Sequence, residues 1–297
     1  MYTEITSNKR KSIALVLIFF LFIVALGYLA TLYFESGPAL ILFVVVVATI
    51  MSLVSYFQGD KIALGVARAH PIAKEDSPYV YRMVENLSIA TGIPLPKIYI
   101  IQNPALNAFA TGRDPEHASV ALTTGIIEGL ENEELEGVIA HELSHVKNYD
   151  IRFMMVVIVC VGIIALIADM TLRGFFWGGM GKRSGKSSQG QGILILIGIA
   201  LAIIAPLVAK LIQLAVSRKR EFLADASGAL ATRYPEGLAR ALEKIAASPT
   251  PLQNANRATA HLYIANPFKD GGLGRAMTNL FSTHPPLEER IRRLRTM

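Results

Sequence analysis

Two long uncharged apolar segments near the N-terminus limit the folds open to this 297-residue chain more than any other feature. Neither Ser12–Phe34 nor Ala39–Phe57 contains an Asp, Glu, Lys or Arg residue. A helix needs about 20 mostly apolar residues to cross the hydrocarbon core of a bilayer. The two segments therefore predict a membrane hairpin. The second follows too soon after the first for the first to be a cleaved signal peptide.

Two further apolar segments lie in the second half of the chain. Phe153–Leu172 contains one charged residue, Asp169, and Ile193–Val216 contains Pro206 and Lys210. Membrane helices tolerate such residues where neighbouring groups satisfy them. Asp169 lies near the end of its segment, and the Lys210 side chain is long enough for its amine to reach the lipid surface. We expect a second hairpin, which either crosses the bilayer or is embedded without crossing.

The distribution of basic residues predicts which side of the membrane each segment faces. Lys9–Lys11 precede the first apolar segment, whereas Glu35–Pro38 between the first two segments carry no positive charge. The positive-inside rule then places the N-terminus and the residues after Phe57 in the cytosol. The basic loop Arg173–Lys186 argues for the opposite orientation. The first helix usually determines the orientation of the whole chain, so we keep the N-terminus in the cytosol.

Composition agrees with a membrane protein and excludes several other classes. Hydrophobic residues make up 52% of the chain and charged residues 18%, whereas an ordinary soluble domain carries about 25% charge. This balance excludes a disordered chain and a coiled coil, and a single cysteine, Cys160, excludes a disulfide within the chain. The formal charge of +6 comes with no nucleic-acid-binding motif. We therefore expect contact with a lipid bilayer surface and no nucleic-acid partner.

The remaining residues form two blocks, Gln58–Asp150 and Ser217–Met297, which together suffice for one compact domain. In the first block, Asp76–Thr91 has the apolar spacing of an amphipathic helix, with Val80, Met83 and Leu87 on one face. Three β-rich segments predict a small sheet, namely Lys97–Gln102, Leu106–Ala110 and Ala118–Thr123. The predicted fold class is mostly α with a small β-sheet. Along the chain we expect an N-terminal tail with the first hairpin at 1–57 and the first part of the compact domain at 58–152. The second hairpin follows at 153–216, and the second part of the domain at 217–297.

One short motif in the first block carries recognisable chemistry. His141-Glu142-Leu143-Ser144-His145 lies in a predicted helix whose expected N-cap is Asn132. Histidines four residues apart project from one face of a helix, so two neutral imidazoles can bind one Zn²⁺. Glu142 then stands beside the metal, where it suits a base that takes a proton from the attacking water. The alternative, two surface histidines on a polar helix, is disfavoured by the apolar flanks.

A catalytic zinc ion needs three protein ligands and an open fourth position. Directly after the fourth apolar segment, Glu221 and Asp225 lie four residues apart in a predicted helix and share a face. Glu221 can bind the metal, and Asp225 can hold the free nitrogen of a ligating histidine. From the spacing alone, a pair of solvent-exposed acidic residues with no metal is an equally good interpretation of Glu221 and Asp225. Because the two intervening segments form one hairpin, we expect the two motifs to return to the same side of the membrane.

The motifs resemble those of a known family over nearly the whole chain. His141–His145, Glu221–Asp225 and Phe281–Ile291, with four hydrophobic segments around them, resemble the HtpX-type membrane zinc metalloproteases, which are relatives of the CAAX prenyl proteases. The resemblance implies a zincin-like (gluzincin) catalytic domain that faces the cytosol. It also implies a four-span, multi-pass protein of the cytoplasmic (inner) cell membrane, whose catalytic domain is interrupted by a transmembrane hairpin.

The resemblance also assigns roles by motif match. It implies one Zn²⁺ per chain, and the implied ligands are His141, His145 and Glu221. Glu142 is implied to activate water, and Asp225 and Arg290 to lie around the ligands. His284 is implied to border the active site and stabilise the oxyanion, although a turn before the helix-starting Pro285-Pro286 is an ordinary alternative. Taken without the resemblance, Glu288–Arg295 is predicted to be a charged, solvated helix face.

A short segment resembles the edge strand with which such proteases hold substrate. Its residues are Asn107, Ala108, Phe109 and Ala110. An exposed strand edge pairs with an extended peptide through main-chain hydrogen bonds, which suits a sequence-tolerant protease. An internal strand or a loop is the alternative.

We therefore predict an integral membrane zinc endopeptidase that hydrolyses misfolded or damaged membrane proteins in quality control and stress response. A membrane chaperone or scaffold with structural zinc, which holds clients without cutting them, is the alternative from another class. It lacks the closed fourth ligand that a structural zinc site needs. A transporter that uses Asp169 and Lys210 is disfavoured because the chain contains no internal repeat.

Overall fold

The computed structural model describes residues 2–34, 38–157, 159–160, 163–164, 218–252, 262–265 and 285–297. Helices dominate these residues, and they surround one four-stranded sheet. The expected fold class, mostly α with a small sheet, is therefore confirmed. Asp169, Lys210 and His284 lie outside the described residues, as does most of the predicted second hairpin.

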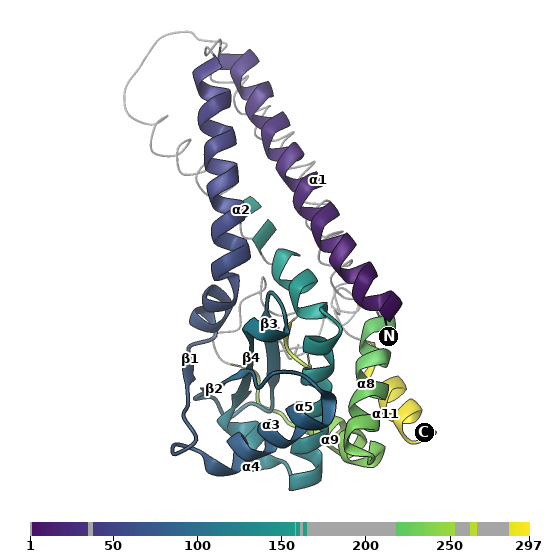
Figure 1. The fold of residues 1–297 in the computed structure, drawn as a ribbon. Coiled ribbons are helices and arrows are strands. Elements are labelled where there is room, and N and C mark those ends of the chain that lie inside the picture. Colours follow the sequence, from purple (N-terminus) through teal and green to yellow (C-terminus); the bar gives the residue numbers. More distant parts are fainter. Residues whose placement is uncertain are drawn as a thin grey trace.

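Two long helices extend from one side of the molecule. They are α1 (Tyr2–Phe34) and α2 (Pro38–Val66), which contain the first two predicted apolar segments and meet at the far tip (Figure 1). Large apolar side chains such as Leu21 and Phe43 are exposed along them. Within the described ranges, no single helix meets the length and hydropathy required to cross a bilayer. One bent pair, Ile41–Val54 with Tyr56–Val66, meets them by length and composition.

The sheet has the strand order β1-β2-β4-β3. Its strands are β1 (Ala69–Pro71), β2 (Lys97–Ile101), β3 (Ala108–Gly112) and β4 (Ala118–Thr123), and a short 3-10 turn, Pro115–His117, precedes β4. Strands β2 and β4 are parallel, and the other pairs are antiparallel. The three predicted β segments are thus confirmed. The three-residue strand β1 was not predicted, because it is too short to show alternation.

One helix runs through the centre of the domain. It is α5 (Asn132–Lys147), and its apolar residues Leu135, Val138 and Ile139 are fully buried. The helix begins one residue earlier than predicted, with Glu131 instead of Asn132 at the N-cap. The Glu131 backbone N–H is satisfied by the Glu134 carboxylate at 2.9 Å. The neighbouring helices are α3 (Pro78–Thr91), whose predicted apolar face is buried, and the short α4 (Thr124–Gly129).

Three helices from the C-terminal part of the chain belong to the same domain. They are α8 (Arg218–Thr232), α9 (Pro235–Ala247) and α11 (Leu287–Leu294). Helix α8 approaches α5 closely at Gly228, where an added Cβ atom would lie 3.0 Å from the His141 backbone nitrogen. An added methyl group would be tighter against this backbone than most Cβ contacts, so glycine suits the crossing, and the close approach brings α8 against the helix that carries the His141 motif.

Replacement of Gly228 tests this crossing. We expect Gly228→Ala to lower the free energy of unfolding by about 1–3 kcal/mol, because the new methyl group meets backbone atoms that have little room to move. Thermal unfolding in detergent, followed by circular dichroism, measures the change. Ser227→Ala on the same helix serves as the control, and equal stability of the two variants would contradict the close packing.

Candidate active site

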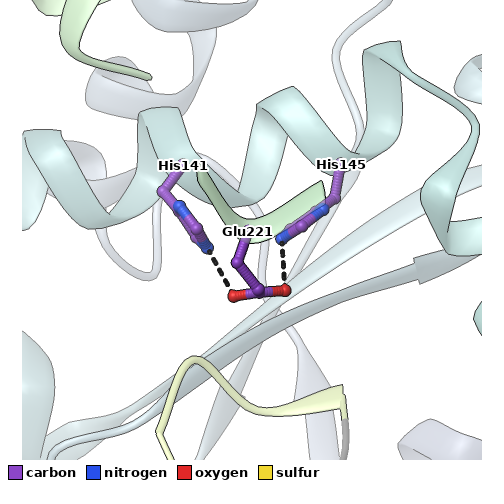
Figure 2. A group of neighbouring side chains, drawn as sticks. All are labelled: His141, His145 and Glu221. Carbon is purple, nitrogen blue, oxygen red and sulfur yellow. Dashed lines mark ion pairs between the residues drawn. The ribbon is translucent and has the colours of Figure 1, made fainter. Parts of the chain in front are cut away.

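The two histidines of α5 face a carboxylate from α8. His141 Nε2 lies 3.9 Å from Glu221 Oε2, and His145 Nε2 lies 3.7 Å from Glu221 Oε1. Figure 2 shows both imidazoles projecting from the same side of the helix, with the Glu221 carboxylate between their tips. All three side chains are buried. Residues 76 or more positions apart in the sequence thus meet in one cluster.

The donor set of this cluster fits a metal ion. One donor atom from each of His141, His145 and Glu221 lies within 4.8 Å of the others. Two ligands bound tetrahedrally to zinc at about 2.0–2.1 Å lie about 3.3 Å apart, slightly closer than the imidazole–carboxylate distances here. Two imidazoles and one carboxylate, with a fourth position open, are the ligand set of a catalytic zinc site.

The other nitrogen of His141 is held by a buried ion pair. His141 Nδ1 lies 2.9 Å from Asp225 Oδ1. Arg290 binds the Asp225 carboxylate in a bidentate manner, from Nε at 2.9 Å and from Nη2 at 2.7 Å. Arg290 is fully buried, so the expectation of a solvated helix face at Glu288–Arg295 is wrong for this residue. Its burial follows from the Asp225 charge, which Arg290 neutralises inside the domain.

The other nitrogen of His145 is held by a carboxylate that sequence reasoning missed. Asp150 Oδ2 lies 3.0 Å from His145 Nδ1, and Asp150 is 1% exposed. It follows the end of α5, where Tyr149 adopts a left-handed backbone conformation with φ of 60°. This turn separates α5 from the helical residues that begin at Asp150 and places the Asp150 carboxylate beside the histidine. The available signal was an acidic residue five positions after the second histidine.

Glu142 lies between the two histidines in sequence and faces the sheet. Its carboxylate accepts a hydrogen bond from the Ala110 backbone N–H on β3. Burial is the largest influence on Glu142 and, with the nearby Glu221 charge, raises its pKa to about 7. A carboxylate with a pKa near neutrality can both accept and return a proton. The site therefore combines a metal-binding cluster with an adjacent acid–base group.

Comparison with known proteins agrees with this arrangement. The pattern of Peptidase family M48 matches residues 74–297, which include every residue of the cluster. The chain belongs to this family. It is therefore a metallopeptidase, which hydrolyses peptide bonds, as the sequence predicted.

Relatives along the full length support the same conclusion. The chain is 46% identical over 297 residues to a protein named Protease HtpX homolog from Tropheryma whipplei (strain TW08/27), covering 100% of this chain and 98% of the relative. It is 45% identical over 298 residues to the protein of the same name from Thermoanaerobacter pseudethanolicus, with the same coverage. The predicted resemblance to HtpX-type proteases is confirmed.

A solved structure shows the same fold. The crystal structure of S. mikatae Ste24p superposes with a TM-score of 0.53 at 19% identity, covering 99% of this chain and 67% of that chain. At this identity the likeness concerns the fold alone. It supports a common arrangement of helices and sheet in the two proteins.

The predicted substrate strand lies at the edge of the sheet in this peptidase. The Asn107 carbonyl accepts a hydrogen bond from the Thr123 N–H on β4. Because backbone groups alternate in antiparallel pairing, the N–H and C=O groups of Ala108, Ala110 and Gly112 point away from β4, toward the outer edge of the sheet. The Ala108 carbonyl already accepts from Ile264 N at 3.0 Å. The Asn107 side chain also donates to the Ala265 carbonyl at 3.2 Å. The chain itself thus covers the Asn107–Ala108 end of the edge, and Phe109 lies buried against Tyr263. All five residues of β3 are buried, so the strand lies at the edge of the sheet but is not exposed as the sequence predicted.

The remaining histidines do not join the cluster in the described part of the chain. His70 is exposed, and His117 is exposed and paired with Asp114 at 2.6 Å. His261 and His284 lie outside the described residues. The implied role of His284 therefore stays a prediction.

The two imidazoles differ in their affinity for protons. Burial and the Arg290 charge lower the pKa of His141 to about 4, so this imidazole is neutral at pH 7. Burial also opposes the charged form of His145. The hydrogen bond that His145 Nδ1 donates to Asp150 and the charges of Glu221, Asp150 and Glu142 outweigh burial and raise the pKa of His145 to about 9. A metal ion must therefore displace a proton from His145 but not from His141.

Proton release on metal binding tests this difference. At pH 8, we expect Zn²⁺ added to chelator-treated protein to release about one proton from His145, in addition to the proton given up by zinc-bound water, because His145 alone of the two histidines is protonated. Metal affinity should rise with pH and level off above about pH 9. Calorimetry in buffers of different ionisation enthalpy measures the proton count. Asp150→Asn should reduce the release, and an unchanged count in that variant would contradict the assignment to His145.

Removal of Arg290 tests the buried pair beside His141. Arg290→Met leaves the Asp225 carboxylate buried without its partner, so we expect the free energy of unfolding to fall by about 3–5 kcal/mol. Arg292→Met, on the exposed face of the same helix, should change it by less than about 0.5 kcal/mol. Thermal unfolding in detergent measures both. Similar unfolding temperatures for the two variants would show that the pair is not structural.

Proposed function

We propose that this M48 peptidase is a zinc-dependent endopeptidase of the cytoplasmic membrane that cleaves misfolded or damaged membrane proteins. The observation that carries the proposal is the position of Glu142. Its carboxylate contacts the outer edge of β3 through the Ala110 N–H, and it stands on the same helix turn as His141. A proton-transferring group thus lies between a metal-binding cluster and a strand edge suited to a peptide.

In this proposal His141, His145 and Glu221 hold one zinc ion. When bound, zinc supplies Lewis acidity, which polarises a peptide carbonyl and makes a water molecule more acidic. Glu142 takes a proton from the attacking water and then gives it to the leaving amine. Asp225 and Asp150 hold the Nδ1 atoms of the two histidines, so that both Nε2 atoms stay directed at Glu221.

The substrate backbone is proposed to pair with the β3 edge beyond Ala108. Asn107 and Ala108 are occupied by residues 264–265, so the Ala110 carbonyl and the Gly112 backbone, which are buried, are the groups left for a peptide. Main-chain pairing does not depend on the identity of the substrate side chains. It therefore suits unfolded clients of varied sequence, which is why we favour a role in quality control.

The membrane assignment rests on the first two helices. Exposed apolar side chains cover α1 and α2 over the length of the predicted hairpin, for example Leu17, Leu42 and Phe43. A monomeric domain in water rarely exposes so large an apolar surface. Lys9–Lys11 at the start of α1 favour a cytosolic catalytic domain. The second hairpin at 153–216, inserted between the two parts of the domain, belongs to the same proposal.

A chaperone with structural zinc is less well supported. Among the described residues, the metal-binding group contains three members, His141, His145 and Glu221, and no fourth His, Cys, Asp or Glu joins them. A structural zinc site is closed by four protein ligands, whereas a catalytic site keeps one position open.

Substitution of the base separates catalysis from metal binding. We expect Glu142→Ala to keep zinc and fold but to lose at least about 100-fold in the hydrolysis of unfolded casein by detergent-purified protein, because proton transfer is removed. His141→Ala should lose the metal as well. Chelator-treated wild type provides the third comparison. Wild-type rates in the Glu142→Ala variant would refute the proposed role of this residue. A zinc-loaded wild type that never cuts casein would favour the chaperone.

A further inference from the structure

An asparagine from the first helix reaches the metal-binding cluster. The Asn8 Nδ2 atom on α1 donates to Asp150 Oδ1 at 2.7 Å and to the Asn148 carbonyl at 3.0 Å. Asn8 is 1% exposed although it precedes the predicted first membrane segment. In Figure 1 the N-terminal end of α1 lies at the catalytic domain, away from the tip where α1 and α2 meet. Asn8 and Ser12 on this end of α1 are buried, so one face of the helix packs against the domain.

The chemistry of this contact requires a hydrogen-bond donor at position 8. Both partners, a carboxylate and a backbone carbonyl, can only accept hydrogen bonds. The amide group of Asn8 supplies two donor hydrogens, one for each partner. A bond from a neutral donor to a buried carboxylate is among the stronger hydrogen bonds in proteins. Asn8 therefore stabilises the Asp150 carboxylate inside the domain.

The Asp150 carboxylate is held from both of its oxygens. Oδ1 accepts from Asn8 and lies 3.8 Å from Arg220 Nε, while Oδ2 lies 3.0 Å from His145 Nδ1. With Oδ1 fixed, the carboxylate cannot rotate away from the imidazole. The plane of the His145 ring, and hence the direction of its Nε2 atom toward Glu221, follows from this restraint.

We propose that Asn8 is a positioning residue of the metal centre, which orients His145 through Asp150. This inference rests on the proposed zinc site. Groups that orient a ligating histidine typically change metal affinity by about 10- to 100-fold when they are removed. Because Asn8 lies on α1, the helix that continues into the predicted membrane hairpin, metal affinity depends on the docking of this helix against the catalytic domain.

The experiment compares zinc affinities of full-length, detergent-purified variants by competition with a chromophoric chelator. Asn8→Ala should weaken zinc binding about tenfold, because Asp150 loses the donor that fixes it. The matched control is Ser12→Ala, which removes a buried hydroxyl one turn further along α1 that donates only to the Asn8 carbonyl within the helix. This control should bind zinc like the wild type. Asn8→Ser, whose hydroxyl is too short to reach Asp150, provides a second variant if Asn8→Ala fails to fold.

A double variant shows whether Asn8 acts through Asp150. Asp150→Ala should weaken zinc binding by about 10- to 100-fold, and adding Asn8→Ala to it should bring no further loss. A purely structural role of Asn8 would give additive losses, and additive losses would overturn the proposal. So would equal affinity of the Asn8 variants and the wild type. If the wild type itself binds no zinc, the proposed function fails and this inference with it, whereas normal wild-type binding with unaffected Asn8 variants refutes the inference alone.

Discussion

The site depends on one repeated interaction, a carboxylate bound to the Nδ1 atom of each buried imidazole. Asp225 binds His141 at 2.9 Å, and Asp150 binds His145 at 3.0 Å. Each contact directs the Nε2 atom of its imidazole toward Glu221, which gives the cluster its shape. A buried carboxylate is stable only when it is paired or hydrogen-bonded. Each therefore needs a further partner, and those partners come from opposite ends of the chain.

The two partners explain why remote segments belong to the catalytic domain. Arg290 on α11 neutralises Asp225, and Asn8 on α1 donates to Asp150. The first and last described helices thus both contribute to the same centre. The partners also differ in charge. Both imidazoles are buried, which lowers the pKa of each. The Arg290 guanidinium lowers the pKa of His141 further, whereas the Asp150 hydrogen bond and the charges of Glu221, Asp150 and Glu142 outweigh burial and raise the pKa of His145.

The sequence predicted the parts of the site that helical spacing determines. His141 and His145, four residues apart, share one face of α5, and Glu221 and Asp225 share one face of α8. The strands β2, β3 and β4 followed from β-rich segments between turn residues. The solvated acidic pair that spacing left open is excluded by the burial of both carboxylates.

The outer contacts of the site could not be predicted in the same way. Asp150 reaches His145 only because Tyr149 takes a left-handed conformation after α5 ends, which no periodic pattern indicates. Asn8 and Asp150 are far apart in the sequence, so their hydrogen bond depends on how α1 docks. Arg290 stands in a strongly charged helix, and its burial follows from the position of Asp225.

The central claim is that two imidazoles and one carboxylate from two distant helices bind a single catalytic metal ion. X-ray absorption spectroscopy at the zinc edge, on detergent-purified protein with its zinc content measured, tests it most directly. The account predicts one zinc per chain, with two imidazole nitrogens and oxygen ligands at about 2.0–2.2 Å. Substoichiometric zinc, or a first shell without imidazole nitrogens, would contradict it.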